Sequence, residues 1–180
     1  MVTEIPFDVA NIPGPETGEV VAPEVIGSYI SSAKRPLLVV GSEILRDGFF
    51  VEIAIELGKK GIPIAATGHS IKGFVEKGYS ENVQYYNLHD LTNCLRDPNW
   101  KGLDGKGNYD FVIFFGITYY YASQMLSCIK NFATDPLIRA VSIDRYYHPN
   151  ARMGFANITP RQEEEYKAML NRVVGSIKRR

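Results

Sequence analysis

The apolar positions of this chain form short continuous runs that alternate with longer segments of helical spacing. The clearest example lies between residues 36 and 71. Residues 37–40 are an apolar run that stops at Gly41, and residues 62–66 are a second run that follows Gly61. Between them, apolar side chains recur about every 3.6 residues, as on one face of a helix. We therefore predict a strand, a helix and a second strand parallel to the first, since a crossover helix joins parallel strands.

The same alternation continues to the end of the chain. Further strands are predicted at residues 83–86, 110–116 and 137–143, and the run DFVIFFG at 110–116 is the strongest of them. Helices are predicted after Pro23, over 70–77, over 88–95, after Thr118 and after Thr159, where Pro160 and Gln162 complete a capping-box pattern. This order predicts an α/β, three-layer Rossmann-like domain with a parallel sheet of five to six strands and helices on both faces.

Residues 1–22 differ in composition from the rest of the chain. Three prolines and two glycines fall within the first 18 residues and disfavour both helix and strand. We interpret residues 1–22 as an extended N-terminal arm and residues 23–180 as a single nucleotide-binding-like domain. The arm is either a disordered tail or a segment that lies along a partner, because its apolar side chains have no evident helix to belong to.

The charge balance and the cysteine content limit which classes of function this protein can have. The 180 residues hold 20 basic and 20 acidic side chains, and this zero net charge argues against nucleic acid as a partner and permits self-association of the isolated chain. Cys94 and Cys128 fall within predicted helices, and their spacing does not match a disulfide or metal-binding motif. We therefore expect both to be reduced residues of the hydrophobic core. No apolar stretch approaches the roughly 20 residues that span a bilayer, and the start is unlike a signal peptide, so we expect a cytoplasmic protein.

In a parallel sheet, ligands bind beyond the carboxyl ends of the strands. Four loops meet this rule, at residues 41–43, 67–70, 116–119 and 144–149. The first reads GSEILR and lacks the second and third glycines of the dinucleotide fingerprint, and no GxxxxGK[ST] loop occurs. Ordinary NAD binding and P-loop chemistry are therefore weakly supported.

Some polar and aromatic residues in and near these loops have alternative readings. Asp144 lies with Arg145 and Tyr146 at a strand end. The Asp144 carboxylate suits a ribose hydroxyl and the Arg145 guanidinium suits a phosphate, or the charged groups form a surface ion pair. Three successive tyrosines, 119–121, cannot all face the core, so one or two should be exposed as a stacking wall or a protein interface. Trp100 more simply anchors its loop on the core than binds a base.

Catalytic and metal chemistry have little support in the sequence. His69 beside Ser70 is a candidate general base, although an exposed loop histidine more often bonds locally. His89 and His148 lie far apart, and no CxxC, HExxH or cysteine cluster is present. We therefore expect no catalytic residue and no metal on this chain.

Five blocks, read together, resemble one family. They are KRPLLVVGSEI, GIPIAATGHSIKGF, DFVIFFGITYYYASQMLS, VSIDRYYHPNA and, in the arm, ANIPGP. They resemble the epsilon subunits of the archaeal acetyl-CoA decarbonylase/synthase, or carbon monoxide dehydrogenase, complex. That resemblance implies an accessory subunit paired with a nickel-iron-sulfur alpha subunit in an alpha-two, epsilon-two assembly that interconverts CO and CO2. Two roles for the accessory subunit are implied: stabilising the alpha pair, or transferring electrons with FAD.

The blocks also look, more distantly, like the FAD- and NAD-binding domains of thiamine diphosphate enzymes and transhydrogenases. This second resemblance implies a cofactor site, with FAD as the candidate, at the strand ends. The resemblance implies that Gly41, Thr67, Gly68, Gly116 and Asp144 contact the cofactor, and Ser42, Thr118 and Arg145 of the same loops are further candidate cofactor-binding residues. The single glycine of the first loop departs from the pattern of those relatives.

Overall fold

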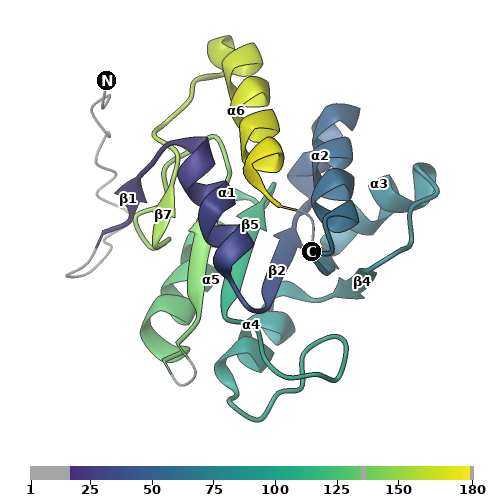
Figure 1. Ribbon diagram of the computed structural model, residues 1–180, viewed down its shortest axis with the longest axis vertical. Helices are drawn as coiled ribbons and strands as arrows, with labels where there is room; N and C mark the ends of the chain where they lie inside the picture. Colours follow the sequence, from purple (N-terminus) through teal and green to yellow (C-terminus); the bar gives the residue numbers. More distant parts are fainter. Residues whose placement is uncertain (1–16, 135–136, 179–180) are drawn as a thin grey trace.

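Seven parallel strands form one sheet in the computed structural model, which describes residues 17–134 and 137–178 (Figure 1). Their order across the sheet is β1-β7-β6-β5-β2-β3-β4. The strands are β1 (Glu19–Val20), β2 (Pro36–Val40), β3 (Ile64–Thr67), β4 (Val83–Tyr86), β5 (Phe111–Phe115), β6 (Arg139–Ser142) and β7 (Met153–Gly154). The α/β class and the parallel sheet predicted from the sequence are confirmed.

The five strands predicted from apolar runs are β2 to β6. The sheet has seven strands rather than five to six because β1 and β7 add two-residue pieces at one edge, too short to leave a pattern in the sequence. Backbone bonds hold β1 there: Gly18 N–H donates to the Pro149 carbonyl at 2.9 Å, and Val21 N–H donates to the Gly154 carbonyl at 3.1 Å. The end of the predicted arm is therefore an edge strand, and residues 1–16 lie outside the described residues.

Each predicted helix is present within the described part of the chain. The α-helices are α1 (Pro23–Ser32), α2 (Gly48–Lys59), α3 (Ile71–Glu76), α4 (Leu88–Arg96), α5 (Tyr119–Phe132) and α6 (Glu163–Ser176). Short 3-10 segments, η1 (Ser42–Arg46), η2 (Gly68–Ser70) and η3 (Pro160–Gln162), precede α2, α3 and α6. Thr159 forms the predicted capping box with Gln162, whereas the Thr118 side chain occupies the cap position of α5 without a capping bond.

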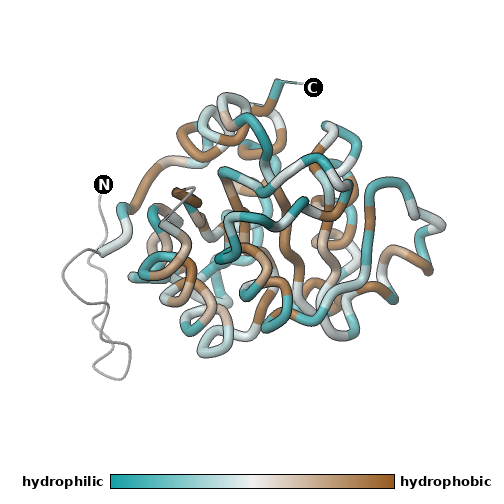
Figure 2. The backbone as a smooth tube through the Cα atoms, turned by 90° about the horizontal axis from the view of Figure 1, so that it is seen from below, coloured by the Kyte–Doolittle hydropathy of each residue, from teal (hydrophilic) through white to brown (hydrophobic). Residues whose placement is uncertain are grey.

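Alternate residues of the central strands supply two hydrophobic cores. On β2, Leu38 and Val40 face α1, α2 and α6, while Leu37 and Val39 face α4 and α5. All four side chains are fully buried, as the continuous apolar run requires of a strand covered on both faces. Figure 2 shows the most hydrophobic residues gathered along the strands in the middle of the fold.

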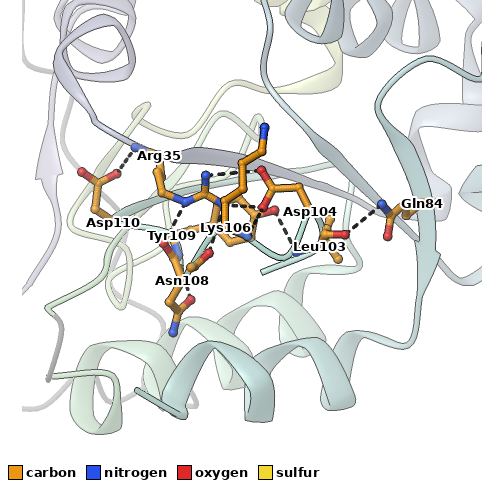
Figure 3. Close-up of polar contacts among 9 residues, drawn as sticks. Arg35, Gln84, Leu103, Asp104, Lys106, Asn108, Tyr109 and Asp110 are labelled. Carbon is orange, nitrogen blue, oxygen red and sulfur yellow. Dashed lines mark hydrogen bonds and ion pairs between the residues drawn. The ribbon is translucent and has the colours of Figure 1, made fainter. Parts of the chain in front are cut away.

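The loop of residues 97–108 is anchored near the amino ends of β2 and β5 by Arg35. Its guanidinium pairs with Asp104 at 2.6 Å, donates to the Asn108 and Gly107 carbonyls, and lies 5.1 Å from the centre of the Tyr109 ring (Figure 3). Trp100 packs between Tyr86 and Tyr109 on the second core. The prediction that Trp100 anchors its loop is confirmed, and this loop lies away from the carboxyl ends of the strands.

The prediction that both cysteines are core residues is wrong. Cys94 and Cys128 are reduced but only half-buried, on helices α4 and α5. The Tyr86 hydroxyl lies 3.7 Å from Cys94 Sγ, and Arg96 Nη1 lies 3.9 Å from Cys128 Sγ. Both thiols sit at the margin of their helix faces, which sequence spacing alone does not resolve. Within the described residues, no helix is long and apolar enough to cross a membrane.

Candidate functional site

The reversal of strand order falls between β2 and β5. From β2 the chain proceeds to β3 and β4 on one side, and from β5 it proceeds to β6 and β7 on the other. The loops that follow two such strands diverge in many doubly wound folds and leave a crevice for a ligand. Gly41 and Gly116 are the first residues of these two loops, and both were predicted to contact a cofactor.

In this structure the crevice between β2 and β5 is closed by backbone contacts. Gly41 N–H donates to the Phe115 carbonyl at 3.0 Å, and Glu43 N–H donates to the Gly116 carbonyl at 2.9 Å. A β-carbon at position 41 would lie 2.5 Å from the Gly116 carbonyl oxygen, and one at position 116 would collide with the Ile44 side chain. The two glycines therefore let two loops touch, and they leave no cradle for a pyrophosphate at this point.

The eight predicted residues all lie at the carboxyl edge of the sheet, but they are divided between two cavities. The smaller cavity, about 250 Å³, is lined by Gly41, Ser42, Thr67, Gly68 and Thr118. The larger cavity, about 690 Å³, is lined by Gly116, Thr118, Asp144 and Arg145. Thr118 and its neighbour Ile117 line both cavities and form the wall between them.

Hydroxyl groups beside the smaller cavity are used to hold the loops together. Thr67 Oγ1 donates to the Val40 carbonyl at 2.8 Å, which joins β3 to β2. The Ser70 hydroxyl is buried and donates to the Val40 and Thr67 carbonyls. A nucleophilic Ser70 activated by His69 would need that hydroxyl in another orientation. The geometry therefore gives no support to hydrolase chemistry at this pair.

Asp144 is the central polar group of the larger cavity. Its side chain is buried, with 8% of the residue exposed, and Oδ1 accepts a hydrogen bond from Gly116 N–H at 2.5 Å. Oδ2 has no hydrogen-bond partner among the described residues. Burial raises the pKa of the Asp144 carboxyl to about 7, and the nearby Glu43 carboxylate acts in the same direction.

His148 lies beside Asp144 and lines the same cavity. Its Nε2 is 3.9 Å from Asp144 Oδ2, and its ring stacks on Tyr119 with ring centres 4.5 Å apart. Burial lowers the pKa of His148 to about 4, so the imidazole is neutral at pH 7. Among the described residues, neither the carboxyl nor the imidazole pairs with a charged group of opposite sign.

Arg145, which the sequence suggested as a phosphate ligand or as part of a surface ion pair, forms an ion pair with a residue of α6. Its guanidinium pairs with Glu163 at the start of α6 and lies 5.1 Å from the centre of the Tyr166 ring. The Tyr166 hydroxyl in turn donates to the Ile143 carbonyl at 2.9 Å. Arg145 therefore fastens α6 to the end of β6, and a phosphate at this position would compete with Glu163.

Tyrosines form the rim of the larger cavity. Tyr119 makes edge contacts with Tyr120 and Tyr146, with ring centres 5.4 and 6.3 Å apart. Tyr120 is 62% exposed and Tyr146 is 42% exposed, whereas Tyr119 and Tyr121 are partly buried. The prediction that one or two of the three successive tyrosines face solvent is confirmed.

Comparison with known proteins gives the family. The sequence profile described as "CO dehydrogenase beta subunit/acetyl-CoA synthase epsilon subunit" matches residues 1–174. This chain belongs to that family. The epsilon subunit of the acetyl-CoA decarbonylase/synthase complex of Methanothrix soehngenii is 55% identical over 175 residues, covering 97% of this chain and 92% of the relative. The resemblance seen in the five sequence blocks is confirmed.

Two further relatives of this epsilon-family chain carry the same description. Subunit epsilon 1 from Archaeoglobus fulgidus is 42% identical over 171 residues, covering 95% of this chain and 91% of the relative. Subunit epsilon 2 from Methanosarcina mazei is 43% identical over 157 residues, covering 87% and 88%. The similarity therefore extends over nearly the full length of both proteins in each comparison.

Sequence reasoning missed two residues of the site in this epsilon-family chain. His148 was considered only as a metal ligand, and Tyr146 only as a neighbour of Asp144, yet both line the larger cavity. Their position in a strand-end loop was a usable signal. Among residues 17–134 and 137–178, no group of three or more His, Cys, Asp or Glu side chains is arranged to hold a metal ion.

Proposed function

We propose that this chain is a non-catalytic accessory subunit of an acetyl-CoA decarbonylase/synthase complex, in which it stabilises the large subunit that carries the nickel and iron-sulfur centres. Its relatives are named as epsilon subunits of that complex. The proposed assembly has two large and two epsilon subunits. One structural observation favours a stabilising role over a cofactor-carrying one. It is the backbone contact that closes the crevice between β2 and β5.

A carrier of dinucleotides needs free backbone N–H groups where the first strand ends, because these groups bind the pyrophosphate. Here Glu43 N–H is already bound to the Gly116 carbonyl, and Ile44 fills the space beside Gly116. The residues at the junction of β2 and β5 therefore do not fit a pyrophosphate. This arrangement favours a scaffold over a redox carrier that binds in the usual crevice.

The rim of the larger cavity supports a docking role. Exposed tyrosines are enriched at protein interfaces because they combine a large apolar surface with a hydrogen-bonding hydroxyl. Tyr120 and Tyr146 are both exposed at one edge of the sheet, beside a cavity that recesses the surface. We place the large subunit against this edge.

Reconstitution tests the stabilising role. The purified large subunit is mixed with this chain, and the mass of the complex is measured by size-exclusion chromatography with light scattering. We expect a stable complex of two subunits of each kind and a higher unfolding temperature for the large subunit than when it is alone. A complex that forms without raising that temperature, or no complex at all, would contradict the proposal.

A second candidate function is an FAD- or dinucleotide-binding electron-transfer subunit. The observation that favours it is the larger cavity, whose volume of about 690 Å³ lies in the range of ligand sites. Tyrosines at its rim suit the stacking of a flavin or adenine ring, and Asp144 suits a ribose hydroxyl.

Calorimetric titration with FAD separates the two candidates. FAD is added to the isolated chain and then to the complex with the large subunit. Micromolar binding that is weakened by Asp144→Ala, in the larger cavity, would favour the carrier and overturn the scaffold proposal. The absence of FAD binding in both states, together with a stable complex, is the result that we expect.

A further inference from the structure

The larger cavity combines an uncompensated buried carboxyl with a rim of aromatic rings. We propose that this cavity is a socket for a cationic side chain, arginine or lysine, presented by the large partner subunit. This inference rests on the proposed function, because it specifies what the docked subunit inserts at the carboxyl edge of the sheet.

The charges around the cavity leave one carboxyl without a cation. Three of its acidic residues have basic partners: Glu43 pairs with Arg46, Glu163 pairs with Arg145, and Asp47 pairs with Lys167 at 2.7 Å. Asp144 has no such partner among the described residues, and its neighbour His148 is neutral. A guanidinium or ammonium group in the cavity would supply the missing charge beside the buried Asp144 carboxyl.

The aromatic rim suits the same kind of ligand. The faces of tyrosine rings carry negative charge density and attract cations, and arginine stacks on them with its planar guanidinium. Tyr119, Tyr120 and Tyr146 meet at the rim in edge-to-face pairs, with interplanar angles of 84° and 89°. Because neighbouring rings stand nearly perpendicular to each other, they present faces in more than one direction to a side chain that enters the cavity.

An anionic group is disfavoured in the same place. The two arginines that line the cavity, Arg46 and Arg145, are held by Glu43 and Glu163. A phosphate would have to displace a carboxylate from one of them and approach Asp144 as well. With about 690 Å³, the cavity also has room for the backbone that carries an inserted side chain. The charges and the volume of the cavity therefore both favour a cationic side chain inserted by a protein partner.

The first experiment measures the affinity between this chain and the purified large subunit by calorimetry at pH 8. The test variant is Asp144→Asn, which retains an oxygen to accept from Gly116 N–H and removes the charge. The matched control is Glu76→Gln, an exposed position on helix α3, which makes the same change in net charge away from the cavity. We expect binding about tenfold weaker or more for Asp144→Asn and unchanged for Glu76→Gln.

The second experiment uses the isolated chain and needs no complex. Ethylguanidinium chloride, sodium phosphate and ADP are titrated separately while the ring resonances of Tyr120 and Tyr146 are followed by NMR. We expect saturable shifts with ethylguanidinium alone, reduced in Asp144→Asn. Thermal unfolding of both variants shows that each is folded before its affinity is compared.

The outcomes distinguish this inference from the function on which it rests. A wild-type complex whose affinity is unchanged by Asp144→Asn overturns the socket and leaves the accessory role standing. The absence of a wild-type complex overturns the accessory role. The ethylguanidinium titration then tests the socket by itself, and the absence of saturable ring shifts overturns it. Ring shifts produced by phosphate or ADP but not by ethylguanidinium would show an anion site and overturn the inference.

Discussion

Asp144 Oδ2 and His148 Nε2 lie 3.9 Å apart, a separation too long for a hydrogen bond. Burial raises the pKa of Asp144 to about 7 and lowers the pKa of His148 to about 4. Between these values both side chains are neutral, so the buried pair is held without charge. The two shifts have opposite effects on how stability depends on pH.

The first prediction concerns Asp144. Its folded pKa is above the ordinary value of 3.8, so its contribution to stability is complete below pH 3.8 and is lost as pH rises through about 7. The free energy of unfolding of Asp144→Asn minus that of the wild type should therefore rise between pH 4 and pH 7. The slope should approach about 1.4 kcal/mol per pH unit. Urea unfolding at a series of pH values measures this difference, and a flat difference would contradict the assigned shift.

The second prediction concerns His148. Its folded pKa is below the ordinary value of 6.5, so its contribution to stability is present above pH 6.5 and is lost as pH falls through about 4. The free energy of unfolding of His148→Phe, which retains a ring to stack on Tyr119, should gain on the wild type as pH falls through that range. Urea unfolding again measures the difference. If the free energy of unfolding of His148→Phe instead falls relative to the wild type as pH falls, the imidazole is charged in the folded protein.

The third prediction tests the closed crevice. Gly41→Ala and Gly116→Ala should each lower the free energy of unfolding by about 1–3 kcal/mol, because a β-carbon at either position meets the opposite loop. Gly116 also has a φ of +67°, which disfavours any residue with a side chain. Gly175→Ala on α6 is the matched control, since it has open space around it and should stabilise the helix slightly. Equal effects at all three positions would argue against the contact.

The fourth prediction uses the single tryptophan as a reporter. Arg35→Met removes the ion pair with Asp104 and the bonds to the loop of residues 97–108. Trp100 should then become more exposed, with a red-shifted fluorescence emission and a loss of stability of about 1–3 kcal/mol. Arg161→Met in the exposed segment η3 should change neither. An unchanged emission in Arg35→Met would mean that the loop is held by packing alone.

The fifth prediction tests the docking edge. The double variant Tyr120→Ala with Tyr146→Ala should bind the large subunit about tenfold more weakly or worse, with little change in its own unfolding temperature, because both rings are exposed. Phe132→Ala, at the exposed end of α5, is the control and should bind normally. If both variants bind equally well, the large subunit docks elsewhere.

Strands β2, β3 and β5 were predictable because each lies in a short run of apolar residues, and β4 and β6 were predictable from apolar residues mixed with polar ones. The six α-helices were predictable from spacing and from signals such as Pro23 and Thr159. The two-residue strands β1 and β7 were not, because their pairing is set by contacts of residues 18–21 with a loop more than 120 residues away. The positions of Cys94 and Cys128 were misjudged because a helix margin and a helix core differ by a fraction of a turn.

The candidate residues were placed correctly at the carboxyl edge, since that follows from the parallel sheet. Their division into two cavities was not predictable, because it depends on how closely the loops after β2 and β5 approach each other. Gly41 and Gly116 read as residues that leave space for a ligand, and in the structure they leave space for each other. The burial of His148 likewise depends on Tyr119, which is the first residue of helix α5.

The contact between Glu43 N–H and the Gly116 carbonyl sets a limit on the length of any molecule that the carboxyl edge can hold. A ligand that filled both cavities at once would have to cross the wall of Ile117 and Thr118, which directly follow the bonded Gly116. Short molecules and single side chains meet no such barrier on either side. We therefore expect the two compartments at this edge to take separate occupants, one on each side of Ile117 and Thr118.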